Sequence, residues 1–153
     1  MANASGSKLV CFFLGGQEYA ARIEHMKETL TVRPISRVFL TPPWVAGVLN
    51  LRGDIVAVLD LAHMLGMAPT EITNDSRILI ALYEGKRAGI LVDRMAELRD
   101  VDPAGLQPPP PTLPADAAGL LLGVATVEQG APLRVLDIAA VFESDRLREY
   151  RRA

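Results

Sequence analysis

Short apolar runs separated by glycine and proline dominate the chain, which is the pattern of β-strands joined by turns. Residues 8–14 and 17–23 flank a pair of glycines, so they predict a β-hairpin. Residues 77–83 and 87–92 flank a similar turn and predict a second hairpin. Further strands, rich in Val, Leu and Ile, are predicted at residues 46–51, 54–59, 96–101, 121–128 and 133–136. The pattern therefore predicts a mainly β (all-β) fold.

Helical spacing is limited to two stretches, and an aspartate precedes each of them. Residues 61–65 follow Asp60 and end at Gly66, whereas residues 138–152 follow Asp137. Aspartate suits the N-cap because its carboxylate accepts hydrogen bonds from the free backbone N–H groups of the first turn. The sequence therefore predicts one short central helix and a C-terminal helix.

The chain contains an internal repeat. Residues 58–62 (Val-Leu-Asp-Leu-Ala) recur at 135–139 (Val-Leu-Asp-Ile-Ala), and residues 8–28 align without a gap on residues 77–97. Both copies show the same order of strand, glycine turn, strand, acidic residue, methionine and glutamate. Each copy is too small to bury a large core by itself, so we predict two similar half-domains packed face to face.

Composition narrows the class of protein. Half of the 153 residues are hydrophobic and the formal net charge is −2, so no strong field attracts nucleic acid or an anionic membrane. The N-terminus lacks the pattern of a secretory signal, and no apolar run of about 18 residues is present to span a bilayer. The single cysteine, Cys11, cannot form an internal disulfide and is expected to be buried and inert. We therefore expect a soluble, cytoplasmic protein without nucleic-acid or membrane partners.

Two segments stand outside the predicted strands. Residues 1–7 are expected to be disordered. Residues 102–119 hold six of the eleven prolines, four of them consecutive, so this segment is interpreted as an extended connector, with a docking site as the alternative.

Residues for a catalytic or metal site are scarce. His25 and His63 are the only histidines, and neither has the spacing of a metal-binding pair. No glycine-rich phosphate loop follows a strand and opens a helix. We therefore predict that the protein is not an enzyme and that it has no metal or other cofactor.

Residues 47–61 carry a specific motif, G-V-L-N-L-R-G-D-I-V-A-V-L-D-L. This run resembles the signature of the CheW-like domain family, the coupling proteins of bacterial chemosensory arrays. Residues 42–45, 89–93 and 135–137 fit the same template, so the resemblance covers nearly the whole chain. Ala57 departs from it, since the family often has proline at that position.

The resemblance implies one domain, residues 8–153, built from two five-stranded SH3-like β-barrels that share a hydrophobic core. The half-domains are then approximately residues 8–70 and 77–143, and the boundary stays open because strands can be exchanged between halves. It also implies a non-catalytic adaptor that links the cytoplasmic tip of chemoreceptors (methyl-accepting chemotaxis proteins) to the regulatory domain of the histidine kinase CheA. The alternative is another SH3-like interaction module, one that binds proline-rich or extended peptides.

Arg52 is the polar residue that the repeat sets apart, because residues 50–52 align with residues 126–128, where glutamate replaces arginine. One interpretation has Asn50 and Arg52 on the same face of a strand, with Arg52 exposed at a receptor-binding groove. The favoured interpretation pairs Arg52 with Glu28, where the family also carries an acid, because a half-buried guanidinium without a counter-charge is costly. Both can hold, and Gly53 completes the motif.

Three further residues are candidates for the receptor- or kinase-binding surface. Met26 aligns with a receptor-facing position of the family, although core filling is favoured because Met95 repeats it. Gly47 lacks a side chain and so offers room for a partner helix. Trp44, the only tryptophan, is either a binding hot spot or a plug over the end of a barrel.

Overall fold

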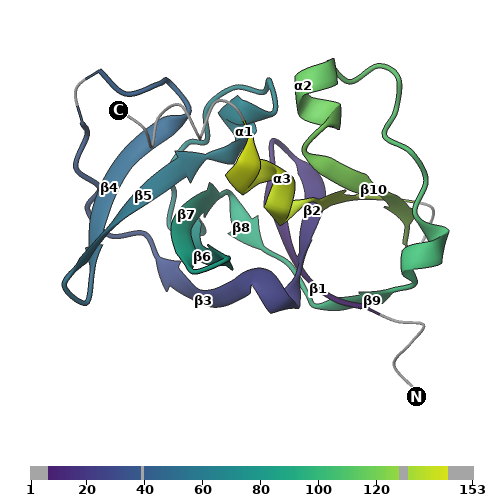
Figure 1. The fold of residues 1–153 in the computed structure, drawn as a ribbon, viewed down its shortest axis with the longest axis horizontal. Helices are drawn as coiled ribbons and strands as arrows, with labels where there is room; N and C mark the ends of the chain where they lie inside the picture. The colour runs from purple at the N-terminus through teal and green to yellow at the C-terminus, as the bar shows by residue number, and fades with distance from the viewer. Residues whose placement is uncertain (1–6, 39, 128–130, 145–153) are drawn as a thin grey trace.

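The computed structural model describes residues 7–38, 40–127 and 131–144, and its strands form two sheets that lie side by side (Figure 1). In the five-stranded lobe the order is β3 (Met26–Thr31), β6 (Arg77–Tyr83), β7 (Lys86–Val92), β5 (Asp54–Asp60) and β4 (Val45–Leu51). In the six-stranded lobe the order is β10 (Leu121–Thr126), β11 (Pro132–Leu136), β2 (Gln17–Arg22), β1 (Ser7–Leu14) and β8 (Arg94–Met95), with β9 (Arg99–Val101) also paired to β1.

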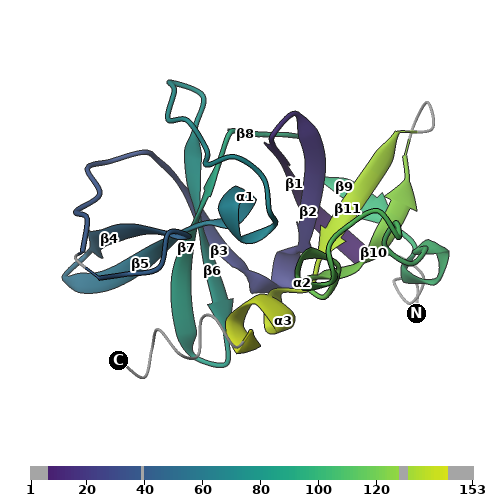
Figure 2. The same cartoon turned by 90° about the horizontal axis from the view of Figure 1, so that it is seen from above.

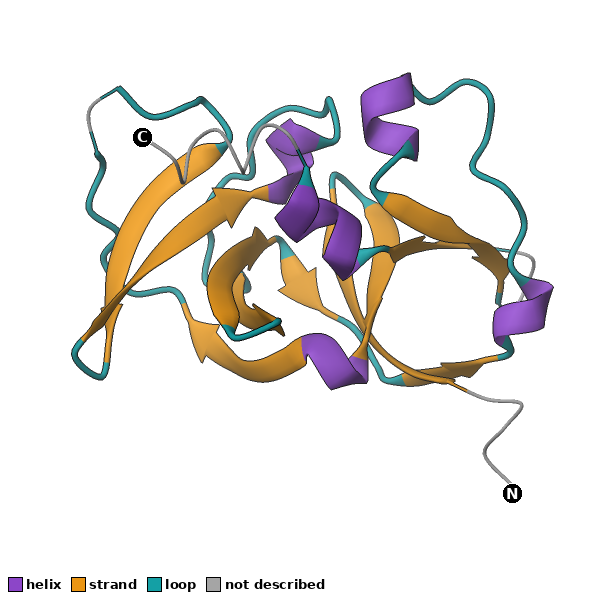
Figure 3. Ribbon diagram, viewed as in Figure 1, coloured by secondary structure: helices purple, strands orange, loops and turns teal. Residues whose placement is uncertain are grey.

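The helices are few and short (Figure 3). They are η2 (Ile23–His25), α1 (Leu61–Met64), η3 (Pro103–Gly105), α2 (Ala115–Ala118) and α3 (Ile138–Glu143). Helices α1 and α3 lie where the two lobes meet (Figure 2), and each has its predicted aspartate cap. Asp60 accepts a hydrogen bond from the His63 N–H at 3.2 Å, and Asp137 accepts one from the Ala140 N–H at 3.1 Å. No helix within the described ranges is long and apolar enough to cross a membrane.

The predicted fold class is confirmed, since two packed β lobes and a C-terminal helix are present. One difference is that only residues 99–101 of the strand predicted at 96–101 form a strand, β9, while β8 lies just before the predicted range and brings this sheet to six strands. Another is β3, which the pattern did not predict because this edge strand buries only Leu30.

Three terminal or loop segments, residues 1–6, 128–130 and 145–153, lie outside the described residues, as does residue 39. They include most of the N-terminal segment predicted to be disordered, the end of the predicted strand 121–128 and the end of the predicted terminal helix. Ser7, predicted to be disordered, is the first residue of β1.

The two halves of the sequence exchange their first hairpins. Hairpin β1–β2 lies in the sheet of β10 and β11, whereas hairpin β6–β7 lies in the sheet of β3, β4 and β5. Two equivalent parallel pairings, β2 with β11 and β7 with β5, make these connections. Each lobe therefore draws strands from both halves of the chain.

Three tight turns fix the register of the hairpins. Two residues connect the paired positions in each case: Gly15-Gly16, Arg52-Gly53 and Glu84-Gly85. Both residues of every turn have positive φ, from 50° to 91°, as a type I′ turn requires. A glycine at the second position meets this requirement at low cost in all three turns.

Apolar side chains pack into one shared cluster between the lobes and one cluster inside each lobe. The shared cluster joins Phe12 and Leu14 of the six-stranded lobe to Leu59 and Ile90 of the five-stranded lobe. Helices α1, α2 and α3 contribute to the same cluster. The lobes therefore depend on one another for much of their buried apolar area.

The proline-rich segment 102–119 crosses the surface of the six-stranded lobe between β9 and β10 (Figure 1). Its path includes η3, a bridge from Gln107 to Val124 of β10, and α2. Asp102 caps η3 by accepting a hydrogen bond from the Ala104 N–H at 3.0 Å. Only Ala117 of α2 is fully buried, so the segment is anchored at a few points.

Candidate functional site

The signature motif forms the tip of the β4–β5 hairpin. Strand β4 ends at Leu51, whose side chain is buried, and Arg52 and Gly53 form the turn with φ values of 51° and 91°. Asn50 stabilises the turn, because its side-chain oxygen accepts a hydrogen bond from the Gly53 N–H at 2.8 Å. The prediction that Asn50 and Arg52 share a strand face is therefore wrong, since the strand ends between them.

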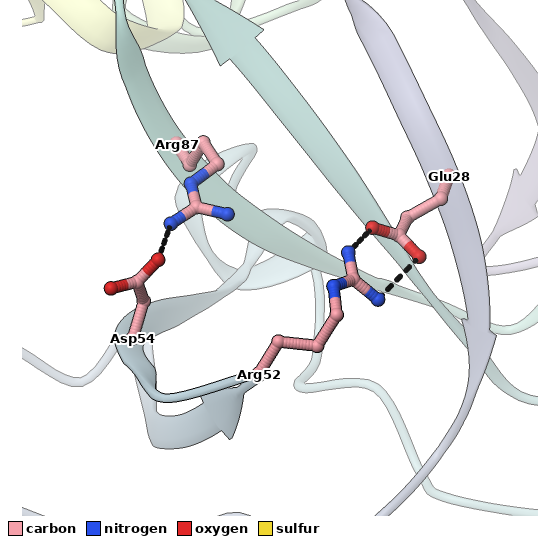
Figure 4. A network of polar contacts seen from close by, with 4 residues as sticks. All are labelled: Glu28, Arg52, Asp54 and Arg87. Carbon is pink, nitrogen blue, oxygen red and sulfur yellow. Dashed lines mark hydrogen bonds and ion pairs between the residues drawn. The ribbon is translucent and has the colours of Figure 1, made fainter.

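Arg52 forms a two-pronged ion pair with Glu28 of β3 (Figure 4). Its Nη1 lies 3.4 Å from Oε1 of Glu28, and its Nη2 pairs with Oε2. The hydrogen bond from Arg52 lowers the pKa of Glu28, and the same bond raises the pKa of Arg52. The favoured internal pairing is therefore present in the structure.

The pair lies on the surface and not in the core. The side chain of Arg52 is 66% exposed and that of Glu28 is 30% exposed, so the expectation of a half-buried guanidinium is wrong. Strands β3 and β4 are the two edges of the five-stranded sheet, so the ion pair links one edge to the other. The adjacent bridge between Ser36 and Val48 makes a second link between the segment after β3 and β4.

A second ion pair, which the sequence patterns did not indicate, holds the same hairpin from its other strand. Nη2 of Arg87 on β7 lies 2.5 Å from Oδ2 of Asp54, the first residue of β5 (Figure 4). Arg52 and Asp54 flank Gly53, so the turn is tied to two different strands. The hairpin register places Asp54 opposite Leu51, next to the turn, but nothing in it identifies Arg87 as the partner of Asp54.

The fold requires glycine at position 47, because no space is left for a side chain. Its φ is 151°, and a Cβ there would lie 2.6 Å from Cγ2 of Ile35 and would collide with the Ser36 carbonyl. Gly123 repeats this arrangement, since a Cβ there would lie 2.7 Å from the Gln107 oxygen. The space beside Gly47 is thus filled by the chain itself and not left open for a partner helix, and a binding role for this residue stays a prediction.

Trp44 and Met26 both contact the core between the lobes. Trp44 is 4% exposed within the shared cluster, and its carbonyl accepts a hydrogen bond from the Asp60 N–H at 2.7 Å. Met26 is half-buried against the same cluster, and so is its repeat counterpart Met95. The position of Met26 fits its core-filling interpretation, and Trp44 is buried in the shared cluster; the roles of both in binding stay predictions.

The structure therefore brings together four of the seven candidate residues, Glu28, Asn50, Arg52 and Gly53. An exposed apolar residue, which no sequence pattern indicated, lies beside them: Ile55 pairs with Asn50 and is 68% exposed. The described part of the chain holds no cluster of three or more potential metal-ligating side chains. Cys11 is fully buried, and burial raises the pKa of its thiol to about 12.

The sequence model of the CheW-like domain family matches residues 8–146 of this chain. The chain belongs to the CheW-like domain family. It is 29% identical to a chemotaxis protein CheW of Rhizobium meliloti (strain 1021), over 92% of this chain and 90% of the relative. It is also 32% identical to a probable chemotaxis protein CheW of Rhizobium etli, over 71% of this chain and 70% of the relative.

A solved structure shares the fold. The crystal structure of the scaffolding protein TtCheW from Thermoanaerobacter tengcongensis aligns with a TM-score of 0.81 and 28% identity, covering 92% of this chain and 90% of that chain. The resemblance seen in the signature motif and the chemotaxis adaptor role that it implied are confirmed by these matches.

Proposed function

We propose that this CheW-like chain is a non-catalytic cytoplasmic adaptor that couples chemoreceptors to a CheA-type histidine kinase. Its partners are the cytoplasmic tip of a receptor and the regulatory domain of the kinase. The relatives in Rhizobium are chemotaxis proteins and the similar solved structure is that of a scaffolding protein, which supports a role in assembling a signalling complex.

The main support for a binding site at the tip of the β4–β5 hairpin is that two ion pairs hold this tip in place. Arg52 and Asp54 hold the turn to β3 and β7, so the tip is already ordered before a partner arrives. A preordered surface loses less conformational entropy on binding than a free loop does. Exposed charges at such a surface steer association, while apolar contacts contribute most of the affinity. Ile55, which pairs with Asn50 beside the tip and is 68% exposed, is the apolar candidate there, and Met26, two residues before Glu28, is a second candidate.

The test uses reconstituted receptor, kinase and adaptor, with kinase autophosphorylation as the readout. Arg52→Ala should weaken receptor control of the kinase and also lower the melting temperature, because the brace to Glu28 is lost. Arg22→Ala is the matched control, since it removes another exposed arginine that pairs with a nearby glutamate, Glu24, at 2.9 Å. Unchanged receptor control in Arg52→Ala would refute the proposed site.

A charge swap separates bracing from direct contact. Arg52→Glu combined with Glu28→Arg keeps an ion pair between β3 and the turn while it reverses the charges that a partner meets. Restored coupling in the double variant supports bracing, whereas restored stability without coupling supports direct contact with Arg52. Loss of coupling in Arg52→Ala at an unchanged melting temperature would exclude the bracing role.

A pull-down distinguishes the adaptor from a general peptide-binding module. The kinase regulatory domain and the receptor tip should be retained by the immobilised chain, and generic proline-rich peptides should not. Retention of the peptides alone would overturn the proposed function.

A further inference from the structure

A groove of about 590 Å³ lies in the six-stranded lobe between strands β9 and β10. On one side it is lined by residues 97–102 and Gly105, and on the other by Ala125, Thr126 and Val127. β9 and β10 lie at opposite ends of their sheet, so the groove separates two strand edges. Neither the signature motif nor its two ion pairs contributes to this groove.

Backbone hydrogen-bonding groups point into the groove from both edges. The carbonyls of Cys11 and Phe13 on β1 accept hydrogen bonds from the N–H groups of Ala96 and Asp93. Alternate residues of β1 therefore direct their backbone N–H and C=O groups toward β8 and β9. Leu9 is one of these residues, so it forms a hydrogen-bonded pair with Arg99 of β9. Asp100, the next residue of β9, therefore directs its N–H and C=O away from β1 and into the groove.

The same alternation applies to β10. Val124 exchanges two hydrogen bonds of 2.8 Å with Gln107 on the outer side of β10, so Thr126, two residues later, presents its N–H and C=O on that side. Among the described backbone contacts outside the regular strands, none involves Thr126. The edge of β10 therefore offers a donor and an acceptor where the pairing with Gln107 stops.

The other lobe shows how such a gap is bridged. There the bridge between Ser36 and Val48 corresponds to that between Gln107 and Val124, and the ion pair of Glu28 and Arg52 spans the remaining distance between the edges. Glu97 takes the place of Glu28 in the repeat, and it makes no ion pair with any residue that the structure describes. The groove is thus the unbridged counterpart of a site that the first copy of the repeat closes.

The groove is acidic. Glu97, Asp100 and Asp102 line it, and the charge of the one lining arginine, Arg99, is balanced by Glu18 at 2.9 Å. Lys8 approaches Asp100 at 3.5 Å, but both side chains are more than half exposed, so solvent screens this pair. Leu98 adds an exposed apolar side chain at 57%. A segment that binds here needs basic side chains together with a free strand edge.

We propose that this groove binds an extended basic segment of a partner protein, which adds as a short strand to the edge of β10. Main-chain hydrogen bonds to Thr126 continue the pairing begun by Gln107, and basic side chains face Glu97 and Asp100. The interaction does not depend on the adaptor role, because the groove and the hairpin tip lie on different lobes.

The probe is a short fluorescein-labelled peptide of alternating lysine and valine, titrated with the full chain at low salt and followed by anisotropy. Glu97→Lys combined with Asp100→Lys should weaken binding by about tenfold or more, and an alternating glutamate and valine peptide should not bind. Glu71→Lys combined with Asp75→Lys, two exposed acidic residues that do not line the groove, is the charge-matched control and should leave the affinity within about twofold. Equal binding of both peptides, or no effect of the lysine substitutions, would overturn the proposal.

A second pair of variants tests the strand edge. Thr126→Pro removes the N–H that faces the groove and should weaken binding, whereas Thr126→Val keeps the N–H and should not. If the proline variant does not fold, amide chemical shifts of the unmodified chain give the answer. The amides of Asp100 and Thr126 should shift on addition of the basic peptide, and shifts confined to other surfaces would exclude this site.

Discussion

Replacing Asp60 by alanine should destabilise the protein more than the same replacement at its repeat counterpart, Asp137. Asp60 is 6% exposed, and its carboxylate accepts hydrogen bonds from the backbone N–H groups of His63 at 3.2 Å and Thr70 at 3.1 Å. Asp137 is half-buried and accepts one bond, from Ala140 at 3.1 Å. The buried carboxylate thus holds both α1 and the loop that follows it, whereas Asp137 only caps α3.

The expected magnitudes follow from these contacts. Loss of an N-cap costs about 1 kcal/mol of unfolding free energy, and leaving a second, partly buried donor without its acceptor adds up to about 1–3 kcal/mol. Asp60→Ala should therefore cost about 2–4 kcal/mol and Asp137→Ala about 1 kcal/mol. At about 2–4 °C per kcal/mol for a chain of this size, the melting temperature should fall by roughly 5–15 °C and about 2–4 °C respectively.

Calorimetry and urea unfolding monitored by circular dichroism measure both quantities on the same samples. Asp60→Asn is the control, because the amide keeps an acceptor oxygen and should retain much of the lost stability. A loss in Asp60→Ala no larger than in Asp137→Ala would show that the contact to Thr70 contributes nothing, and the reasoning would be refuted.

Three further outcomes are expected. Gly47→Ala should lower the melting temperature clearly more than Gly105→Ala, because a Cβ at Gly47 meets the backbone of the chain while a Cβ at Gly105 meets open space; equal losses would contradict this. The Cys11 thiol should react with a disulfide reagent only after unfolding, since it is fully buried and burial raises its pKa to about 12; rapid reaction of the folded protein would disprove it. Hydrogen bonding from Arg52 lowers the pKa of Glu28, so that pair stabilises the fold above the ordinary glutamate value of about 4.3 and ceases to do so as the pH falls through the lowered pKa. The difference in melting temperature between the unmodified chain and Glu28→Gln should therefore shrink in acid, and a constant difference would count against the pair.

The candidate site was only partly predictable from the residues. The ion pair of Arg52 and Glu28 was favoured because the repeat keeps the glutamate and changes the arginine, and because the family pattern carries an acid there. The pair of Asp54 and Arg87 was not foreseen, since it depends on the parallel pairing of β5 and β7. The turn conformation of Arg52 was also missed, because a polar residue beside a glycine fits a strand end as well as a tight turn.

The sequence by itself determined the hairpins β1–β2 and β6–β7, their glycine turns, the two aspartate caps and the twofold repeat. These features depend on contacts between residues close in the chain, so the alternation of side chains and the permitted φ values are sufficient to specify them. Only the tertiary structure decided that the first hairpins are exchanged, that the space beside Gly47 is filled by the chain, and that one lobe is bridged where the other is open. The two hairpins carry similar apolar patterns, so the choice of partner strand depends on long-range packing in the shared core, which no local pattern specifies.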